Sequence, residues 1–154
     1  MTFPNPKRPL HWLATCFWIG LLKPGPGTWG SAFAIIIIYF APILHSNIGI
    51  TAMLTILIAF LVCILISKDI PEDDHPSIVI DEAAGVAIVL LFLNHGFYEY
   101  LTAFVIFRFF DIIKPWPISW LDRNIKGGVG IVLDDILAGI FSGIIITIFL
   151  SSQI

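Results

Sequence analysis

The feature that most constrains the fold is a series of long uncharged apolar stretches that alternate with short polar turns. Ile48–Ser67 is the clearest, because its length of about 20 residues matches the hydrocarbon thickness of a bilayer. Similar stretches cover residues 31–44, 83–110 and 131–150, and the turn 94–96 interrupts the longest. The interruption predicts two shorter helices, about 83–93 and 98–113. We therefore expect an all-α, polytopic membrane protein with about five membrane helices, some of them short or re-entrant.

The composition supports a bilayer environment. Only 12% of the residues are charged and 58% are hydrophobic, whereas a soluble domain carries roughly 25% charged residues. A chain this apolar could not cover a water-facing surface. No linker or low-complexity tract divides it, so residues 1–154 are expected to form a single membrane-embedded domain. We expect no nucleic-acid partner, and the sequence leaves the oligomeric state open.

The N-terminal apolar stretch, Leu10–Leu22, is shorter than the others and follows the basic residues Lys7 and Arg8. A basic start followed by about a dozen apolar residues is also typical of signal peptides. No small-residue cleavage site follows, and the chain continues into a loop rich in proline and glycine. We therefore interpret Leu10–Leu22 as an interfacial or re-entrant helix that is retained.

The charged residues gather on one side of the predicted bundle. Five spans place all eight basic residues on the same side, which the positive-inside rule assigns to the cytoplasm. Every acid except Glu99 falls there too, although acids contribute little to orientation. This distribution predicts a polar reaction site at the cytoplasmic face of the membrane. A transporter, in contrast, would spread its ionisable groups along a route through the bilayer.

Two acidic pairs, Asp81-Glu82 and Asp134-Asp135, stand at the starts of apolar helices. Acids in a first helical turn are stabilised by the helix dipole, so simple capping is one interpretation. Adjacent helical residues point about 100° apart, so one acid of each pair can face a site and the other a neighbouring loop. Carboxylates that converge in a site of low dielectric repel one another unless a cation binds between them. The four acids are therefore candidate ligands for Mg²⁺ or Mn²⁺.

Arg108, Asp111 and Lys114 follow one another at the end of a single predicted helix. Arg108 and Asp111 share a face and can form an ion pair, while cations at a membrane interface also snorkel toward water. In the functional interpretation, Arg108 and Lys114 bind phosphate oxygens. Asp111 then orients Arg108 or reaches the metal.

Two glycine-containing loops are candidate phosphate-binding segments. In the first, Asp122-Arg123 precedes Gly127-Gly128, whose backbone N–H groups can approach a ligand at a helix N-terminus. Taken alone, this string is also typical of a flexible turn. In the second, Thr28 and Ser31 follow alternating prolines and glycines, and they either cap the next helix or donate to phosphate.

The remaining candidates are weaker. His75 lies in an acidic loop and is interpreted as a solvated side chain, although histidine can act as a general acid or base near neutral pH. Cys16 and Cys63 show no metal-ligand spacing and are interpreted as packing residues.

Four blocks, in order and covering most of the chain, resemble the phosphatidylglycerophosphatase A family. They are PGTWGS at 26–31, SIVIDEAAG at 77–85, FRFFDIIKPWPI at 107–118 and DRNIKGGVGIVLDDILAG at 122–139. The chain departs from the family pattern at Lys23, where a small or neutral residue is expected. It also departs in the loop around His75, which lacks a second histidine and a glycine.

The resemblance implies an Mg²⁺-dependent hydrolase of the bacterial inner membrane that converts phosphatidylglycerophosphate in the bilayer to phosphatidylglycerol and phosphate. On this basis Asp81, Glu82, Asp134 and Asp135 are expected to bind the metal. The residues expected to bind phosphate are Thr28, Ser31, Arg108, Lys114, Arg123, Gly127 and Gly128.

The catalytic route stays open between two mechanisms. In one, Asp111 or Asp122 positions an attacking water or protonates the leaving oxygen, with Asp81 beside the metal. In the other, a carboxylate attacks phosphorus and forms an aspartyl-phosphate. A membrane phosphatidyl-group transferase would also use aspartates and Mg²⁺, but its contiguous DG…AR…G…D…D pattern is absent from the sequence.

Overall fold

The computed structural model describes residues 3–70, 75–94 and 96–151, and within these ranges it contains helices and no strand. The all-α prediction is therefore confirmed for the described part of the chain. In order, the elements are α1 (Pro9–Ala14), η1 (Ile19–Leu21), α2 (Pro26–Phe40), α3 (Pro42–Ser46), α4 (Ile48–Ile66), α5 (Ile80–Val89), η2 (Leu90–Phe92), α6 (Phe97–Ile113), α7 (Ile118–Asn124) and α8 (Gly127–Ser151).

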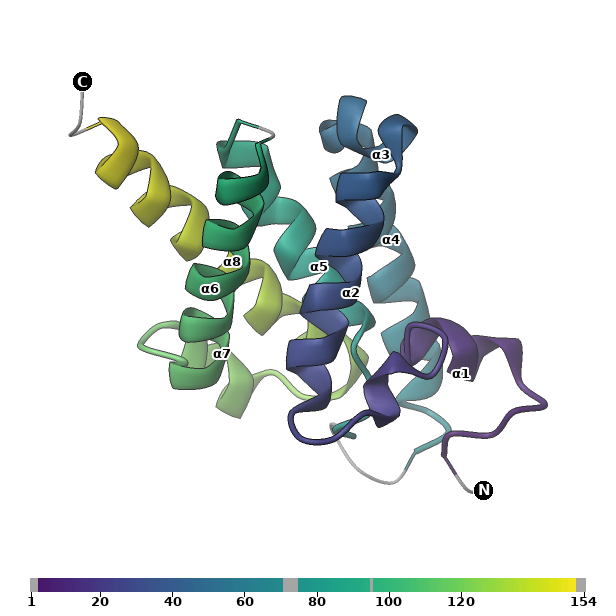
Figure 1. Cartoon of the computed structure of the whole chain (residues 1–154). Coiled ribbons are helices and arrows are strands. Elements are labelled where there is room, and N and C mark those ends of the chain that lie inside the picture. Colours follow the sequence, from purple (N-terminus) through teal and green to yellow (C-terminus); the bar gives the residue numbers. More distant parts are fainter. Residues whose placement is uncertain (1–2, 71–74, 95, 152–154) are drawn as a thin grey trace.

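Helix α5 lies at the centre of the bundle and packs against α2, α4, α6 and α8 (Figure 1). Eight of its ten residues are buried, and four of these are alanine or glycine. Gly85 faces Gly139 of α8, and a Cβ atom on Gly139 would lie only 2.5 Å from the Gly85 carbonyl oxygen. Small residues therefore let α8 cross α5 closely, which brings the first turn of α5 beside Asp135 of α8.

Two helices, α4 and α8, are long and apolar enough to cross a membrane. The other predicted spans are shorter: α2 has 15 residues, α5 has 10 and α6 has 17. Membrane character thus rests on α4 and α8, and the full set of five spans stays a prediction.

The connections place the charged segments at one end of the bundle. Figure 1 shows α1, α7 and the first turns of α2 and α8 toward the lower end, and α3 and the C-terminus toward the upper end. At the lower end, Arg8 pairs with Asp69 at 2.5 Å and so ties the N-terminal segment to the end of α4. The concentration of nearly all charges at one face of the membrane stays a prediction.

The prediction that Leu10–Leu22 forms one continuous helix is wrong. Helix α1 ends at Ala14, and Cys16, Phe17 and Trp18 all have positive φ angles that an α-helix cannot contain. The hydroxyl of Thr15 donates to the carbonyl of His11 and accepts from the amide of Trp18, which stabilises this turn. A second break, at Pro42, divides the predicted helix 31–44 into α2 and α3.

Candidate active site

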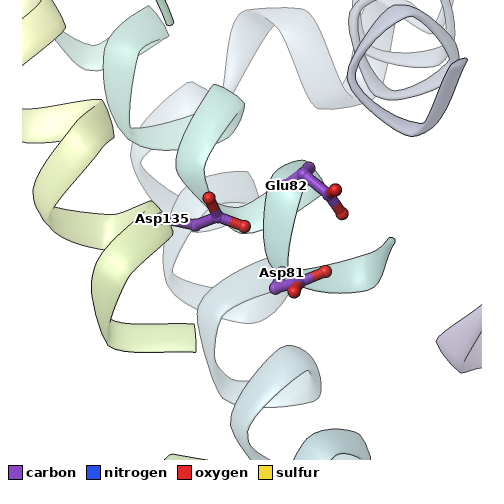
Figure 2. A group of neighbouring side chains, drawn as sticks. All are labelled: Asp81, Glu82 and Asp135. Carbon is purple, nitrogen blue, oxygen red and sulfur yellow. The ribbon is translucent and has the colours of Figure 1, made fainter. Parts of the chain in front are cut away.

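Three carboxylates from two helices converge beside the centre of the bundle. Asp81 and Glu82 occupy the first turn of α5, and Asp135 lies on α8. One oxygen atom from each side chain lies within 4.8 Å of the others. Figure 2 shows Asp135 extending from α8 toward the α5 turn that carries the other two. We refer to Asp81, Glu82 and Asp135 as the acidic triad.

The acidic triad is shielded from solvent. Asp81 is 6% exposed and Asp135 only 4%. The Oε2 atom of Glu82 is also buried and has no hydrogen-bond partner among the described residues. Buried anionic oxygens that approach one another are strongly destabilised unless a cation compensates them. A hard divalent ion such as Mg²⁺ prefers ligands of this kind, so the residues present fit the expected metal.

Arg108 of α6 borders the acidic triad. Its guanidinium forms an ion pair with Asp111 and lies 4.0 Å from Glu82. Asp111 also faces Asp135, so it stands between the cation and the triad. The Arg108 side chain is 14% exposed, and its buried Nε atom has no partner among the described residues. The predicted Arg108–Asp111 pair is thus present, and one donor of the guanidinium is left for a ligand.

The first turn of α2 closes the other side of the acidic triad. A Cβ atom on Gly27 would collide with Glu82 Oε1 and crowd the guanidinium of Arg108, so a larger residue there would have to displace these two side chains. Sequence reasoning placed Thr28 and Ser31 in the site but missed Gly27. The signal was the PGT segment itself, because glycine at the start of a helix permits a close backbone approach. The backbone of the first α2 turn therefore lies directly beside Glu82 and Arg108.

The structure gives different environments to Thr28 and Ser31. Ser31 is fully buried, and its hydroxyl donates to the Gly27 carbonyl at 2.8 Å. Its hydroxyl is therefore occupied within α2. Thr28 is half-buried one turn earlier, directly after Gly27. Of the two, Thr28 is the better placed to meet a ligand beside Glu82.

A second group of charges lies at the junction of α6, α7 and α8. The ammonium of Lys114 donates to Asp122 at 2.7 Å and to Asp134 at 2.5 Å. We refer to these three residues as the lysine cluster. Sequence reasoning predicted Asp134 as a metal ligand beside Asp135, but the structure places it in the lysine cluster and outside the acidic triad.

The lysine cluster holds its charges in place. Burial disfavours the charged form of Lys114, but the hydrogen bonds to Asp122 and Asp134 outweigh it and raise the pKa of Lys114 above its ordinary value. Burial also acts to raise the pKa of Asp122, yet the Lys114 ammonium outweighs it and holds that pKa below its ordinary value. Lys114 therefore remains a cation and Asp122 an anion throughout the neutral range.

The glycine-rich loop contains two glycines with different roles. Gly127 has a φ of +73° and open space around its Cβ position, at the rim of a small hollow that Asp122 and Asp134 also line. Gly128 instead packs against the backbone of Cys63 in α4, where a Cβ atom would collide. The predicted phosphate role thus fits Gly127, whereas Gly128 serves the contact between α8 and α4.

Two other predicted residues lie away from the acidic triad. Arg123 is exposed at the end of α7. His75 is half-buried, its Nδ1 accepts from the amide of Ser77, and its ring contacts Phe3. The acids at 72–74, part of the same loop, fall outside the described residues.

Comparison with known proteins agrees with these motifs. Residues 12–150 match the family described as Phosphatidylglycerophosphatase A. A Haemophilus influenzae protein named phosphatidylglycerophosphatase A is 42% identical, with 95% of each chain covered. An Escherichia coli protein of the same name is 44% identical, with 88% of this chain and 80% of the relative covered.

A third relative carries a different name. A Bacteroides thetaiotaomicron protein, provisionally named a phosphatidylinositol-3-phosphatase, is 37% identical, with 88% of this chain and 90% of the relative covered. No solved structure matches the chain significantly. The family match covers most of the sequence, including every residue of the acidic triad and the lysine cluster. The chain therefore belongs to the phosphatidylglycerophosphatase A family of phosphatases.

Proposed function

We propose that this protein hydrolyses the terminal phosphomonoester of phosphatidylglycerophosphate to phosphatidylglycerol and phosphate, using Mg²⁺. The observation that carries the proposal is the acidic triad with Arg108 beside it, a metal-type donor set next to a phosphate-type donor. The names of two relatives supply the substrate. This reaction would contribute to glycerophospholipid biosynthesis.

Asp81, Glu82 and Asp135 would hold the ion. The role of Asp134 as a fourth ligand, expected from the sequence, has no support from its position beside Lys114. A bound divalent ion supplies Lewis-acid polarisation of a phosphoryl oxygen. It would also compensate the mutual repulsion of the three carboxylates.

The cationic side chains would bind the phosphate oxygens. Arg108 offers a planar set of donors, and Asp111 fixes the orientation of its guanidinium. The Thr28 hydroxyl would add a neutral donor on the side of Gly27. Lys114 and Arg123, on the side of Gly127, would receive the second phosphate of the substrate, which carries a phosphomonoester and a phosphodiester.

In hydrolysis, water attacks phosphorus while the bond from phosphorus to the glycerol oxygen breaks. The water gives up one proton, and the leaving oxygen gains one. Asp111 is placed to accept the first proton, because it lies between Arg108 and Asp135. Asp122, held as an anion by Lys114, would orient that lysine toward the second phosphate of the substrate.

The site would face the cytoplasm in a bacterial inner membrane. Helices α2, α4, α5 with η2, α6 and α8 correspond to the five predicted spans, and the basic residues flank the end that carries the site. The N-terminus would then lie inside and the C-terminus outside. A substrate whose acyl chains stay in the bilayer could reach such a site laterally.

A phosphatidylinositol 3-phosphate head group is the second candidate substrate. The name of the third relative favours it, and both lipids present a phosphomonoester beyond a phosphodiester. The acidic triad and Arg108 would serve either reaction. Parallel assays with the two lipids decide between them.

The test is phosphate release by the purified protein in detergent micelles that contain either lipid, with Mg²⁺ or with EDTA. We expect release from phosphatidylglycerophosphate that requires Mg²⁺ and collapses in the Asp81→Asn and Asp135→Asn variants. Glu99→Gln is the matched control, because Glu99 is an acid in the first turn of α6, roughly 13 Å along the helix from Arg108 at a rise of about 1.5 Å per residue. Absence of release from the folded, Mg²⁺-supplied wild-type protein would overturn the proposal.

A further inference from the structure

A large apolar cavity lies between α2 and α4. Its volume is about 670 Å³, within the range of pockets that hold small molecules. Its walls include Ala34 and Ile37 on α2, and Thr51, Leu54 and Ile58 on α4. Ile37 and Ile58 are more than 40% exposed, so the cavity opens laterally at the surface of the chain. In a membrane, this opening would face lipid.

The polar side chains in the cavity wall are already hydrogen-bonded. The Thr51 hydroxyl donates to the carbonyl of Leu44, and the Thr55 hydroxyl donates to the carbonyl of Thr51. The side-chain amide of Asn47 donates to the carbonyl of Ile43. These bonds leave methyl and methylene groups to line most of the interior, so the cavity suits a hydrocarbon rather than a polar ligand.

One end of the cavity meets the acidic triad. Ile80 and Ala83 of α5 line it, and these residues flank Asp81 and Glu82 directly in the sequence. Because adjacent helical residues point in different directions, the same turn presents carboxylates on one side and apolar groups on the other. A molecule with a phosphate beside the triad therefore has an apolar path away from it.

The length of the cavity corresponds to one leaflet. Its wall on the α4 side extends from Asn47 to Ile58, which is roughly 17 Å of helix at a rise of 1.5 Å per residue. This is about half the thickness of the hydrocarbon core of a bilayer. Because Asn47 precedes α4 at the end of the bundle opposite the site, an acyl chain that enters beside Ile80 and Ala83 would extend along α2 and α4 toward that far end.

A second apolar cavity provides a comparison. It has a volume of about 260 Å³ and lies between α2 and α6, where Ala32 and Ile36 face Tyr100 and Phe104. Its wall is formed by α2 and α6 alone, and it includes none of the α5 residues beside the triad. The two cavities flank α2 on different faces, but only the larger one connects with the acidic end of α5.

We propose that the cavity between α2 and α4 binds one acyl chain of the substrate phospholipid while its terminal phosphate lies at the acidic triad. This inference rests on the proposed function and adds a determinant of substrate choice to it. The cavity makes a phosphorylated lipid a better substrate than the same head group without acyl chains. It also directs the lipid to the site from within the bilayer.

The test compares full-length phosphatidylglycerophosphate with its deacylated head group, glycerophosphoglycerophosphate. Ala34→Phe and Thr55→Phe fill the cavity from opposite walls, and Ala32→Phe fills the second cavity as a matched control. We expect the two filling variants to lower the ratio of kcat/KM for lipid over head group by at least tenfold. The control should leave this ratio within about twofold of wild type. An unchanged ratio in both filling variants would overturn the inference.

A cross-linking experiment on the wild-type protein removes any dependence on the folding of variants. Phosphatidylglycerophosphate with a diazirine at the middle of one acyl chain is photolysed with the protein in micelles, and the labelled residues are mapped by mass spectrometry. Labels on the wall residues support the inference if excess unmodified substrate suppresses them. Labels confined to outward residues such as Leu57 and Leu61 contradict it. Hydrolysis by wild type, measured separately, reports on the proposed function alone.

Discussion

The acidic triad and the lysine cluster meet at consecutive residues of α8, yet their charge balance differs. Around the triad, four carboxylates (Asp81, Glu82, Asp111 and Asp135) share one guanidinium, that of Arg108. In the lysine cluster, two carboxylates share one ammonium at hydrogen-bond distance. Asp134 and Asp135 are consecutive residues that belong to opposite groups. Within the described residues, the negative charges around the triad outnumber the positive ones. In the lysine cluster, the Lys114 ammonium compensates most of the negative charge.

This difference assigns separate tasks to the two groups. A buried group with excess negative charge is stable only when a cation joins it, so the triad is suited to hold a metal. A compensated group needs no metal ion, so the lysine cluster is suited to fix the junction of α6, α7 and α8 and to hold Lys114 in position for the second phosphate. Each of the following changes tests whether the tasks are separate.

The largest expected effect separates Asp134 from Asp135. Asp135→Asn should lower phosphate release about a thousandfold or more, since several kcal/mol of charge stabilisation depends on the ion. It should also raise the thermal stability without Mg²⁺, because it removes one of the repelling carboxylates. Asp134→Asn should cost about tenfold in activity and lower the stability, because the Lys114 ammonium loses an anionic partner. Activity assays and thermal unfolding in micelles measure both quantities.

Equal losses of activity in the two variants would contradict the separation. So would a loss of thermal stability in Asp135→Asn as large as that in Asp134→Asn. Binding of Mn²⁺, followed by its spectroscopic signal, provides a readout that is independent of turnover. Only Asp135→Asn is expected to weaken it.

The second prediction concerns the close approach of α2 to the triad. Gly27→Ala should lower activity by roughly ten- to a hundredfold, because the added methyl group displaces Glu82 and Arg108 from their positions. Gly49→Ala is the matched control, since its Cβ position has no neighbour within 4 Å. Activity in the control should equal that of wild type. If Gly27→Ala is fully active, α2 is not a wall of the site.

The sequence predicted much of this arrangement and missed specific parts of it. The charged motifs and the long helices α4 and α8 were predictable, because hydropathy and charge distribution are local properties of the chain. The expectation that adjacent acids diverge holds for Asp134 and Asp135, but it is wrong for Asp81 and Glu82, which both belong to the acidic triad. Which acid meets Lys114 was not predictable, since it depends on how α8 rotates against α6.

The close contacts between helices could not be predicted from the sequence either. Gly27 and Gly128 occur in similar glycine-containing loops, yet one borders Glu82 and the other the backbone of Cys63. Only the packing of α2 and α8 distinguishes them. The break after α1 was missed because Leu10–Leu22 is mostly apolar and has no acid, lysine or arginine, and no glycine or proline marks the residues of positive φ at 16–18.

The third prediction tests the structural role of the lysine cluster. Lys114→Met should lower the free energy of unfolding by about 1–3 kcal/mol, because Asp134 is left buried without its partner. Activity should fall about tenfold. In a double-mutant cycle with Asp134→Asn, the two stability losses should be less than additive, as expected for groups in contact. Additive losses would show that the pair contributes little.

The smallest effect is expected at Arg123, the predicted phosphate ligand that the structure leaves exposed on α7. An exposed side chain away from packed features changes stability by no more than about 0.5 kcal/mol on substitution, so Arg123→Ala should unfold like wild type. If Arg123 binds the second phosphate of the lipid, its loss should raise KM about threefold to tenfold and leave kcat nearly unchanged. High salt should reduce the difference between the two proteins, because exposed charges are screened. A fall in kcat at constant KM would instead place Arg123 at the reacting phosphoryl group, and the division between the acidic triad and the lysine cluster would then have to be abandoned.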